Sequence, residues 1–231
     1  MMPRLLDLFC GAGGAGVGYA RAGFEVFGVD IEPHDHYPFD MDIGDAFEWI
    51  DEYRAGGNGM DFDIVHASPP CQHYSSTRNL HDAEYPDLID KLRETFDFMG
   101  MPYIIENVVG APLLNPIKLC GSMFGLRVRR HRLFETSVPI PALLPQCNHS
   151  EQGPVVTVAG GGPNPASFNR PAGGGPHRKP KDMADAFDAM GIDWPMTRAE
   201  INEAIPPAYT QWLGERILEL PSAFWSAEVI P

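Results

Sequence analysis

The chain has 231 residues, of which 44% are hydrophobic and 21% are charged, and its formal net charge at pH 7 is −14. These values are typical of a globular protein with one main domain and a small additional segment. No apolar run approaches the ~20 residues that span a bilayer, which argues against a membrane protein.

The amino-terminal residues and the cysteines predict the compartment. Asp7 follows Met1 too closely for the apolar core of a signal peptide. The four cysteines are dispersed along the chain and do not form the pattern of a disulfide framework. We therefore expect a cytoplasmic protein in a reducing environment.

Acidic and basic residues are concentrated in different parts of the chain. Residues 30–63 contain eleven acidic residues and one arginine, and this segment should repel phosphate groups. Residues 127–181 contain eight basic and two acidic residues, so this part could bind nucleic acid despite the negative total. The alternative for each segment is an ordinary solvated surface.

The first predicted elements are a strand, a glycine loop and a helix, over residues 5–9, 10–16 and 17–22. A second strand over 25–30 ends in Asp30. Glycines let the backbone approach a ligand closely, and a carboxylate at a strand end can accept hydrogen bonds from ribose hydroxyls. The pattern predicts a site for a nucleoside-containing cofactor but does not by itself separate NAD from S-adenosylmethionine.

Cys71 is the main candidate for a reactive residue. It follows a strand predicted over 63–67 and comes directly after Pro69 and Pro70. Each proline fixes its own φ at about −65° and favours extended geometry in the preceding residue, so the turn that carries the thiol is stiff. A buried cysteine is usually a small hydrophobic residue, but a stiff turn at a strand end favours a nucleophile.

A helix and a further strand complete the predicted sheet. Apolar residues recur at helical spacing over 85–99, which predicts a helix that covers the sheet. Residues 101–108 read as a buried parallel strand that carries Glu106 near its end. Ligands of open α/β sheets bind at the carboxyl ends of the strands, so we expect Cys71, Glu106 and the glycine loop to line one crevice.

Four motifs occur in order along the chain: DLFCGAGG at residues 7–14, PPCQ at 69–72, ENV at 106–108 and RHRLF at 130–134. In this order and spacing they resemble the DNA cytosine-5 methyltransferase family. The resemblance is strong over residues 1–136 and weak over 182–220, and the short chain is similar to phage- and prophage-borne members. It implies an α/β fold with a Rossmann-like S-adenosylmethionine-dependent methyltransferase sheet.

The same resemblance implies the domain organisation. Residues 1–136 form the catalytic domain, 137–181 a small, reduced target-recognition region, and 182–231 helices that return to the catalytic domain. Two departures affect the contacts that are expected. Val128 stands where the family usually has a glutamine, and the usual Gly-Asn pair is missing from residues 203–210.

The resemblance also implies roles for the catalytic residues. Cys71 adds to C6 of a flipped-out cytosine, which makes C5 nucleophilic, and Glu106 binds the Watson–Crick edge of the base and holds a proton at N3. Arg132 contacts O2 of the base or the covalent adduct. Arg130 orients the nucleophile or a phosphate.

The cofactor implied is S-adenosylmethionine. Phe9 and Ile31 cover the two faces of the adenine, and Asp30 binds the ribose. The remaining expected cofactor contacts are Gly11, Gly13, Asp45, Ala46 and Pro70, of which Asp45 binds the adenine amino group.

For nucleic-acid contacts we expect Ser75 and Arg78, in a loop that closes over the site, together with Arg170, Arg178, Lys179 and Lys181 in and beside glycine-rich loops. The alternative for the glycine-rich part is a disordered linker. Cys120, His131, Cys147 and His149 have side chains that can bind zinc, but their spacing matches no compact ligand pattern, so we expect no metal.

The sequence thus predicts a DNA (cytosine-5-)-methyltransferase that acts on double-stranded DNA in a bacterial cytoplasm. We expect a monomer, with a dimer or a partner that aids recognition as the alternative. The same chemistry on RNA, as in the transfer-RNA cytosine methyltransferases, and a catalytically silent DNA-binding relative are the alternative functions. The sequence leaves open the target sequence, a substituted sulfonium donor, and the choice between restriction–modification, regulation and viral genome hypermodification.

Overall fold

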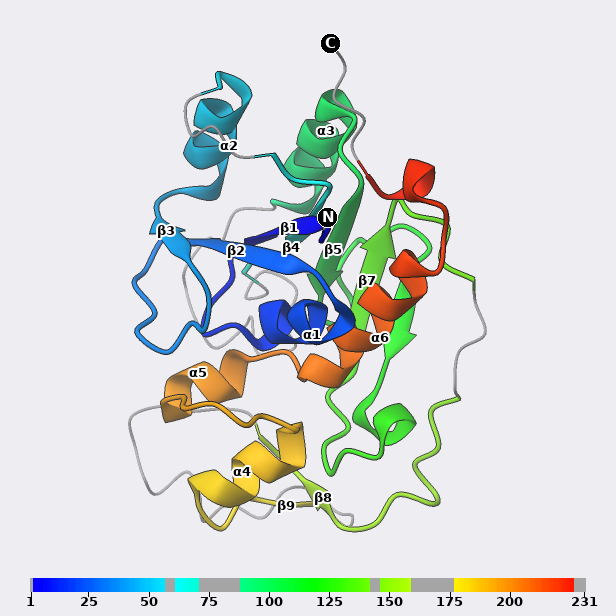
Figure 1. Cartoon of the computed structure of the whole chain (residues 1–231). Helices are drawn as coiled ribbons and strands as arrows, with labels where there is room; N and C mark the ends of the chain where they lie inside the picture. The colour runs from blue at the N-terminus through cyan, green and yellow to red at the C-terminus, as the bar shows by residue number, and fades with distance from the viewer. Residues whose placement is uncertain (1, 57–60, 71–87, 142–145, 159–176, 227–231) are drawn as a thin grey trace.

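The structure is a computed structural model that describes residues 2–56, 61–70, 88–141, 146–158 and 177–226. Within these residues, seven strands form a mixed sheet in the order β3-β2-β1-β4-β5-β7-β6 (Figure 1). Neighbouring strands from β3 to β5 are parallel, whereas β7 runs antiparallel to both β5 and β6. The strands are β1 (Arg4–Leu8), β2 (Glu25–Asp30), β3 (Met41–Ile43), β4 (Ile64–Ala67), β5 (Tyr103–Asn107), β6 (Ile117–Leu119) and β7 (Arg132–Thr136).

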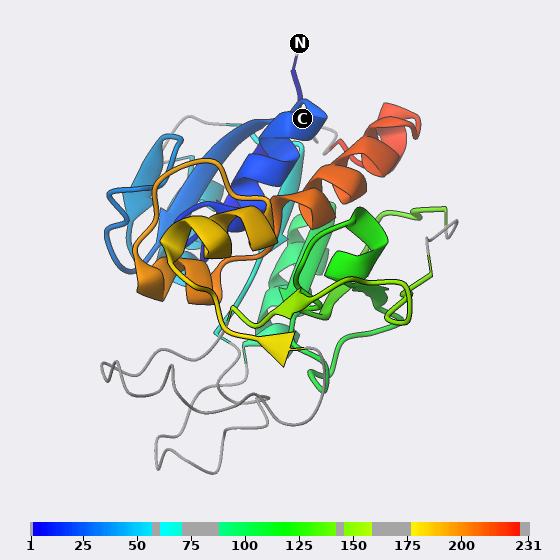
Figure 2. The same cartoon turned by 90° about the horizontal axis from the view of Figure 1, so that it is seen from below.

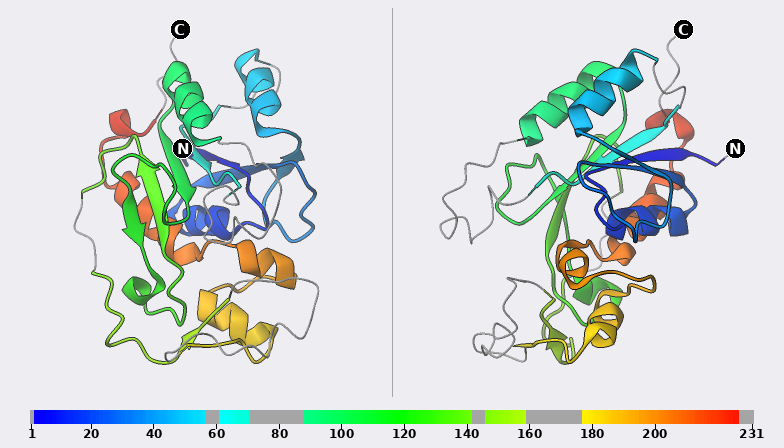
Figure 3. Two further views of the ribbon diagram at one scale, coloured as in Figure 1. Left: turned by 180° about the vertical axis from the view of Figure 1, so that it is seen from behind. Right: turned by 90° about the vertical axis from the view of Figure 1, so that its left-hand side faces the viewer.

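Helices cover both faces of this sheet. α2 (Ala46–Arg54) and α3 (Ile89–Met99) lie on one face, and α1 (Gly14–Ala22) and α6 (Pro207–Leu218) lie on the other (Figure 3). Alternate residues of a strand point to opposite faces, so Leu6 packs with the α2 and α3 side while Leu5 packs with the α1 and α6 side. The predicted α/β sheet is therefore confirmed.

A smaller layer lies beyond α1. It contains the short parallel strands β8 (Val155–Val156) and β9 (His177–Arg178), with α4 (Met183–Met190) and α5 (Arg198–Glu203) beside them (Figures 1 and 2). Its apolar core joins side chains of β8, α4 and α5 to Ala12 of the glycine loop. The 3₁₀ turns are η2 (Gly121–Phe124) and η4 (Ser222–Phe224).

Several predicted elements agree closely with the structure and others were missed. The strand predicted over 25–30 is β2, and the strand predicted over 101–108 contains β5. α3 begins at Ile89, and residues 85–87 of the predicted helix lie outside the described residues. α4, α5 and α6 (Pro207–Leu218) lie in the segment 182–231, where helices were expected, whereas α2 and the antiparallel strand β7 were not predicted. The division at residues 136 and 181 stays a prediction.

Within the described residues, no helix is both long and apolar enough to cross a membrane.

Helix α6 packs against α1 at very close range. The Thr210 hydroxyl donates to the Ala15 carbonyl at 2.8 Å inside this buried contact. A Cβ atom on Gly18 would lie 2.2 Å from the Pro207 carbonyl oxygen and 2.7 Å from the Gln211 nitrogen. The absence of a side chain at Gly18 is therefore a condition for this helix pair.

We expect Gly18→Ala to lower the free energy of unfolding by about 2 kcal/mol or more, because the added methyl group meets backbone rather than a movable side chain. Urea unfolding measures the change. Gly153→Ala is the control, because a Cβ at Gly153 would have no neighbour within 4 Å and the variant should unfold like the parent protein. Equal stability of the two variants would contradict the packing described.

Candidate active site

A cleft of about 470 Å³ lies at the carboxyl ends of the parallel strands. The chain leaves β1 toward β2 on one side and returns to β4 on the other, so this edge is a topological switch point, where open α/β sheets bind ligands. The described residues that line the cleft come from the glycine loop, the ends of β2, β4, β5 and β7, and the segment around α5. They are Phe9, Cys10, Gly11, Ala12, Gly14, Ala15, Asp30, Ile31, Glu32, His34, Ser68, Pro69, Pro70, Glu106, Val108, Arg132, Glu200, Asn202, Glu203, Ala204 and Ile205.

Asp30 organises one end of the cleft. Its carboxylate accepts hydrogen bonds from the backbone N–H groups of Gly11 at 2.9 Å and Glu32 at 3.1 Å. Phe9 has a positive φ of 58° at the start of the loop, and the side chain of Ile31 is 69% exposed. Phe9 and Ile31, which follows β2, therefore line the same cleft as the strand-end carboxylate of Asp30.

Asp7 is a buried carboxyl group that contacts the backbone of the glycine loop. It is fully buried, and burial, with the nearby Asp30 carboxylate, raises the pKa of Asp7 well above its usual value. The backbone N–H of Gly16 and the Tyr37 hydroxyl are its hydrogen-bond partners. Burial thus favours the protonated form of Asp7, which lies behind the glycine loop and does not line the cleft.

Glu106 and Arg132 form a buried ion pair at the other end of the cleft. Arg132 Nε lies 3.0 Å from Glu106 Oε1, although the contact lacks the angles of a hydrogen bond. Burial raises the pKa of Glu106, and the charges of Arg132 and Arg130 oppose this shift. Burial thus favours the protonated carboxyl group of Glu106, while the two arginines favour its carboxylate form.

Asn107 fixes the turn that leads to Cys71. Its side-chain N–H donates to the Pro69 carbonyl at 3.0 Å, and its side-chain oxygen accepts from the Val108 N–H at 2.9 Å. Pro70 lines the cleft. Cys71, the predicted nucleophile, lies outside the described residues.

A buried hydrogen-bonded chain continues from Glu106 into the core, and the sequence analysis missed it. Ser68 hydrogen-bonds Glu106, and its hydroxyl lies 2.8 Å from His66 Nε2. The other ring nitrogen of His66 lies 3.1 Å from the Tyr19 hydroxyl. Burial lowers the pKa of His66 to about 3, so the imidazole is neutral and fixes the orientation of Ser68.

Residues 3–89 match the C-5 cytosine-specific DNA methylase family, and this stretch contains the glycine loop, Asp30 and the proline turn. The match covers 87 of the 231 residues, so the similarity to this family lies in the amino-terminal part of the chain.

Individual relatives support the family assignment over part of the chain. The type II methyltransferase M.AgeI of Thalassovita gelatinovora is 31% identical over 120 residues, which are 46% of this chain and 28% of that protein. The type II methyltransferase M.XorII of Xanthomonas oryzae pv. oryzae is 33% identical over 121 residues, which are 47% of this chain and 28% of that protein. The chain therefore spans less than a third of these curated relatives.

The fold also matches a solved methyltransferase. The structure of Entamoeba histolytica methyltransferase EhMeth superposes with a TM-score of 0.58 at 12% identity, and the match covers 95% of this chain and 98% of that chain. The seven-stranded sheet of the described residues has the methyltransferase topology.

The cleft includes some but not all of the residues predicted to bind the cofactor. Of these residues, those that line the cleft are Phe9, Gly11, Asp30, Ile31 and Pro70. Asp45 instead caps α2, where its side chain accepts from the N–H groups of Phe47 and Glu48, and Ala46 is buried in the first turn of that helix. Gly13 precedes α1 with a φ of 87°, so it is required by the turn.

Arg130, a predicted catalytic residue, holds two segments together. Its guanidinium donates to the carbonyls of Val158 at 2.7 Å and Asn202 at 2.6 Å, which lie beside β8 and in α5. It is not among the described residues that line the cleft. Its electrostatic influence on Glu106 nevertheless places it close to the ion pair.

The carboxyl-terminal segment contributes residues that sequence reasoning missed. Glu200, Asn202 and Glu203 line the cleft, together with Ala204 and Ile205. Glu200 Oε2 lies 3.0 Å from His36 Nδ1, and this contact ties α5 to the loop after β2. The only sequence signal was the position of this segment ahead of the last helix, where the family has its final motif.

The predicted nucleic-acid contacts fall into two groups. Ser75, Arg78 and Arg170 lie outside the described residues. Arg178 and Arg127 both form ion pairs with Asp185. The carboxylate of Asp185 therefore reduces the positive charge of this surface. These hydrogen bonds hold the pKa of Asp185 well below its usual range, with Arg178 as the main cause. Lys181 is exposed, and roles for it and Lys179 toward nucleic acid stay predictions.

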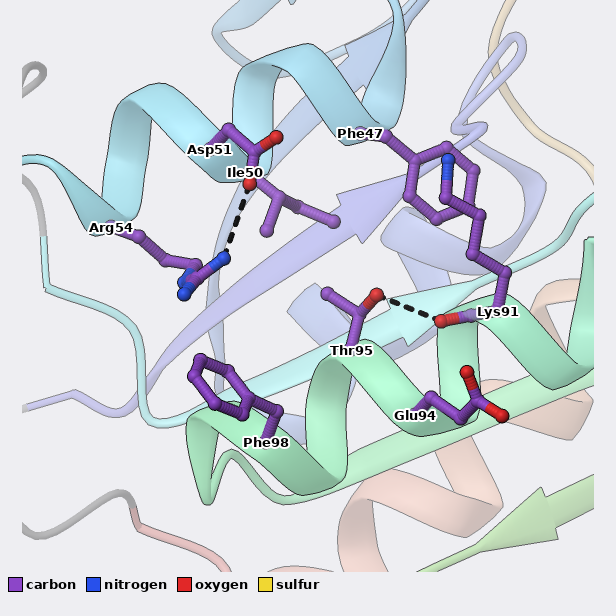
Figure 4. Close-up of a pocket in the computed structure, with 8 residues that line it drawn as sticks. All are labelled: Phe47, Ile50, Asp51, Arg54, Lys91, Glu94, Thr95 and Phe98. Atoms are coloured by element: carbon purple, nitrogen blue, oxygen red, sulfur yellow. Dashed lines mark hydrogen bonds and ion pairs between the residues drawn. The ribbon is translucent and has the colours of Figure 1, made fainter.

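A second hollow, of about 260 Å³, lies between α2 and α3 (Figure 4). Its aromatic side chains are covered by cations of the same chain, since Lys91 Nζ lies 3.6 Å from the centre of the Phe47 ring and the Arg54 guanidinium lies 4.7 Å from that of Phe98. Its carboxylate and guanidinium pair, Asp51 and Arg54, is exposed, unlike that of Glu106 and Arg132, so the larger cleft is the candidate site.

The neutral, buried His66 predicts a dependence of stability on pH. The unfolded chain binds a proton at this residue near pH 6.5, whereas the folded protein does so only near pH 3, so acid favours unfolding between these values. From this residue alone we expect the free energy of unfolding to be about 2 kcal/mol lower at pH 5 than at pH 7.

The test compares the parent protein with His66→Asn by urea unfolding at both pH values. The variant loses stability overall, but its loss between pH 7 and pH 5 should be smaller by about 2 kcal/mol. The other titrating groups are common to both proteins and cancel in the comparison. The same pH dependence in both proteins would show that His66 is not the group responsible.

Proposed function

We propose that this protein transfers a methyl group from S-adenosylmethionine to C5 of a flipped-out cytosine in double-stranded DNA. The observation that carries the proposal is the single cleft that contains the Asp30 carboxylate, the Glu106 and Arg132 pair, and the proline turn leading to Cys71. The match of residues 3–89 to the C-5 cytosine-specific DNA methylase family supports this chemistry. The substrate, the cofactor and the activity are inferences from these residues.

The charges in the cleft suit a cationic cofactor. Asp30, Glu32, Glu200 and Glu203 line it, with Arg132 as the one lysine or arginine among the described lining residues. A diphosphate would be repelled by these carboxylates, whereas the sulfonium and ammonium groups of S-adenosylmethionine would be attracted. Phe9 and Ile31 would hold its adenine, and Asp30 would accept hydrogen bonds from its ribose.

The residues at the other end of the cleft suit attack on cytosine. C5 of cytosine is a poor nucleophile, and S-adenosylmethionine supplies a methyl group on a cationic sulfur. The Cys71 thiolate forms a bond to C6, which raises electron density at C5, while Glu106 holds a proton at N3. C5 would then take the methyl group as the sulfonium S–CH3 bond breaks and S-adenosylhomocysteine leaves. A base would remove the C5 proton, and the electron pair would expel the Cys71 thiolate from C6.

The proposal for the substrate rests on the matched family and on the names of the relatives. The relatives that match are named type II methyltransferases, and the matched family is one of DNA methylases. The target base must leave the duplex, which costs a few kcal/mol. Residues 137–181 are proposed to read the target, as a small recognition region.

We expect Asp30→Ala to weaken S-adenosylmethionine binding by about 10-fold to 100-fold, because it removes a charged hydrogen-bond acceptor. Isothermal titration calorimetry measures the dissociation constant. Asp51→Ala is the control, because Asp51 lies on α2 outside the cleft and pairs with Arg54. Equal affinities of Asp30→Ala and Asp51→Ala would remove Asp30 from the cofactor site.

We expect Cys71→Ser to abolish methyl transfer to duplex DNA, since the serine hydroxyl is a far weaker nucleophile, while cofactor affinity stays unchanged. Glu106→Gln should lower the rate by about 10²-fold to 10⁴-fold, because the amide cannot hold and release the proton. Transfer of a radioactive methyl group measures both effects, and bisulfite sequencing reports the target.

Two further measurements separate the alternatives. A covalent complex with DNA that contains 5-fluorocytosine is expected for the parent protein and not for Cys71→Ser, and its absence from both would argue for a catalytically silent relative. When duplex DNA and transfer RNA are offered together, the protein should methylate the duplex DNA preferentially. Preferential methylation of transfer RNA would keep the chemistry and overturn the choice of substrate.

A further inference from the structure

Two cysteines and two histidines converge at the far edge of the sheet. The ligand atoms of Cys120, His131, Cys147 and His149 all lie within 4.8 Å of one another. We propose that these four residues form a structural zinc site. We refer to them as the Cys₂His₂ cluster.

The distances within the cluster resemble those around zinc. Zinc lies about 2.3 Å from a cysteine sulfur and about 2.0–2.1 Å from a histidine nitrogen, so neighbouring atoms of a tetrahedral set lie roughly 3.3–3.8 Å apart. Cys120 Sγ lies 3.3 Å from His149 Nε2, and Cys147 Sγ lies 3.5 Å from His131 Nε2. The Cys147 Sγ to His149 Nε2 distance is shorter, at 2.8 Å.

The fold explains how ligands that are distant in the sequence meet. Leu119 of β6 pairs with Arg132 of the antiparallel strand β7, and this register places Cys120 opposite His131 at the end of the two strands. Cys147 and His149 form a Cys-x-His pair that reaches the same point from the segment after β7. The spacing along the chain gave no sign of a metal site because the pairing of β6 with β7, which brings Cys120 next to His131, is not visible in the sequence.

The surroundings favour a closed structural site. Four protein ligands of nitrogen and sulfur fill a tetrahedral zinc shell, and two thiolates neutralise the charge of the ion. Ser122 Oγ lies 3.2 Å from Cys120 Sγ and 3.7 Å from Cys147 Sγ, where its hydroxyl can donate to a thiolate. Cys120 is fully buried, which protects one bond to the metal from water.

Zinc at this position would hold the arginine motif in place. His131 stands between Arg130 and Arg132, and its carbonyl accepts a hydrogen bond from Arg132 at 3.0 Å. The segment that carries Cys147 is otherwise tied to the same region through Gln152, whose amide donates to the carbonyls of Leu126 and Val128. The metal would therefore fasten this segment to the strand that brings Arg132 to Glu106.

The test uses the full chain, expressed with added zinc and purified under reducing conditions. Elemental analysis should find about one zinc per chain. After replacement of zinc by Co²⁺, the protein should show the visible absorption of tetrahedral cobalt and a thiolate-to-cobalt charge-transfer band. Cys147→Ser and His149→Asn should lose both signals, while Asn148→Ala, which changes the residue between these ligands, should keep them.

Protein that retains far less than one zinc per chain, or Cys147→Ser protein that binds zinc as the parent does, would overturn the proposal. A Cys120 to Cys147 disulfide that forms in the presence of zinc would also overturn it. Circular dichroism of each variant separates loss of the metal from loss of the fold. None of these readouts depends on methyl transfer, so this test is independent of the proposed function.

Discussion

The buried pair of Glu106 and Arg132 constrains how the rest of the molecule is arranged. A carboxylate and a guanidinium removed from water are stable only when each compensates the other. Glu106 lies near the carboxyl end of β5, and Arg132 begins β7. Because β7 is antiparallel to β5, its first residue reaches the edge where β5 ends, so the reversed strand is what brings the arginine to the cleft.

Local patterns in the sequence predicted the central strands and one end of the cleft. The glycine loop, Asp30 and Glu106 were found because each depends on a strand and the residues directly after it. Other contributions arise from tertiary packing, which a single sequence does not contain. The capping role of Asp45, the reach of Arg130 to two carbonyls, and the entry of Glu200 and Asn202 into the cleft depend on contacts between distant segments.

The buried polar residues beneath the cleft also have partners that could not be predicted from the sequence. His66 reads in the sequence as one residue of an apolar strand, and nothing around it indicates a partner. In the structure it joins Tyr19 of α1 to Ser68, beside Glu106. Similarly, the count of basic residues over 127–181 overstates the free positive charge, because Arg127 and Arg178 both contact Asp185.

Two neighbouring residues of α6 connect the glycine loop to the segment just before Arg132. Thr210 bonds to the carbonyl of Ala15 behind the glycine loop, and the Tyr209 hydroxyl donates to the carbonyls of Arg129 and Arg130 at 3.2 Å and 2.9 Å. α6 thus sets the separation between the glycine loop, which donates to Asp30, and the segment that carries Arg132. The width of the cleft therefore depends on two residues of α6 that do not line it.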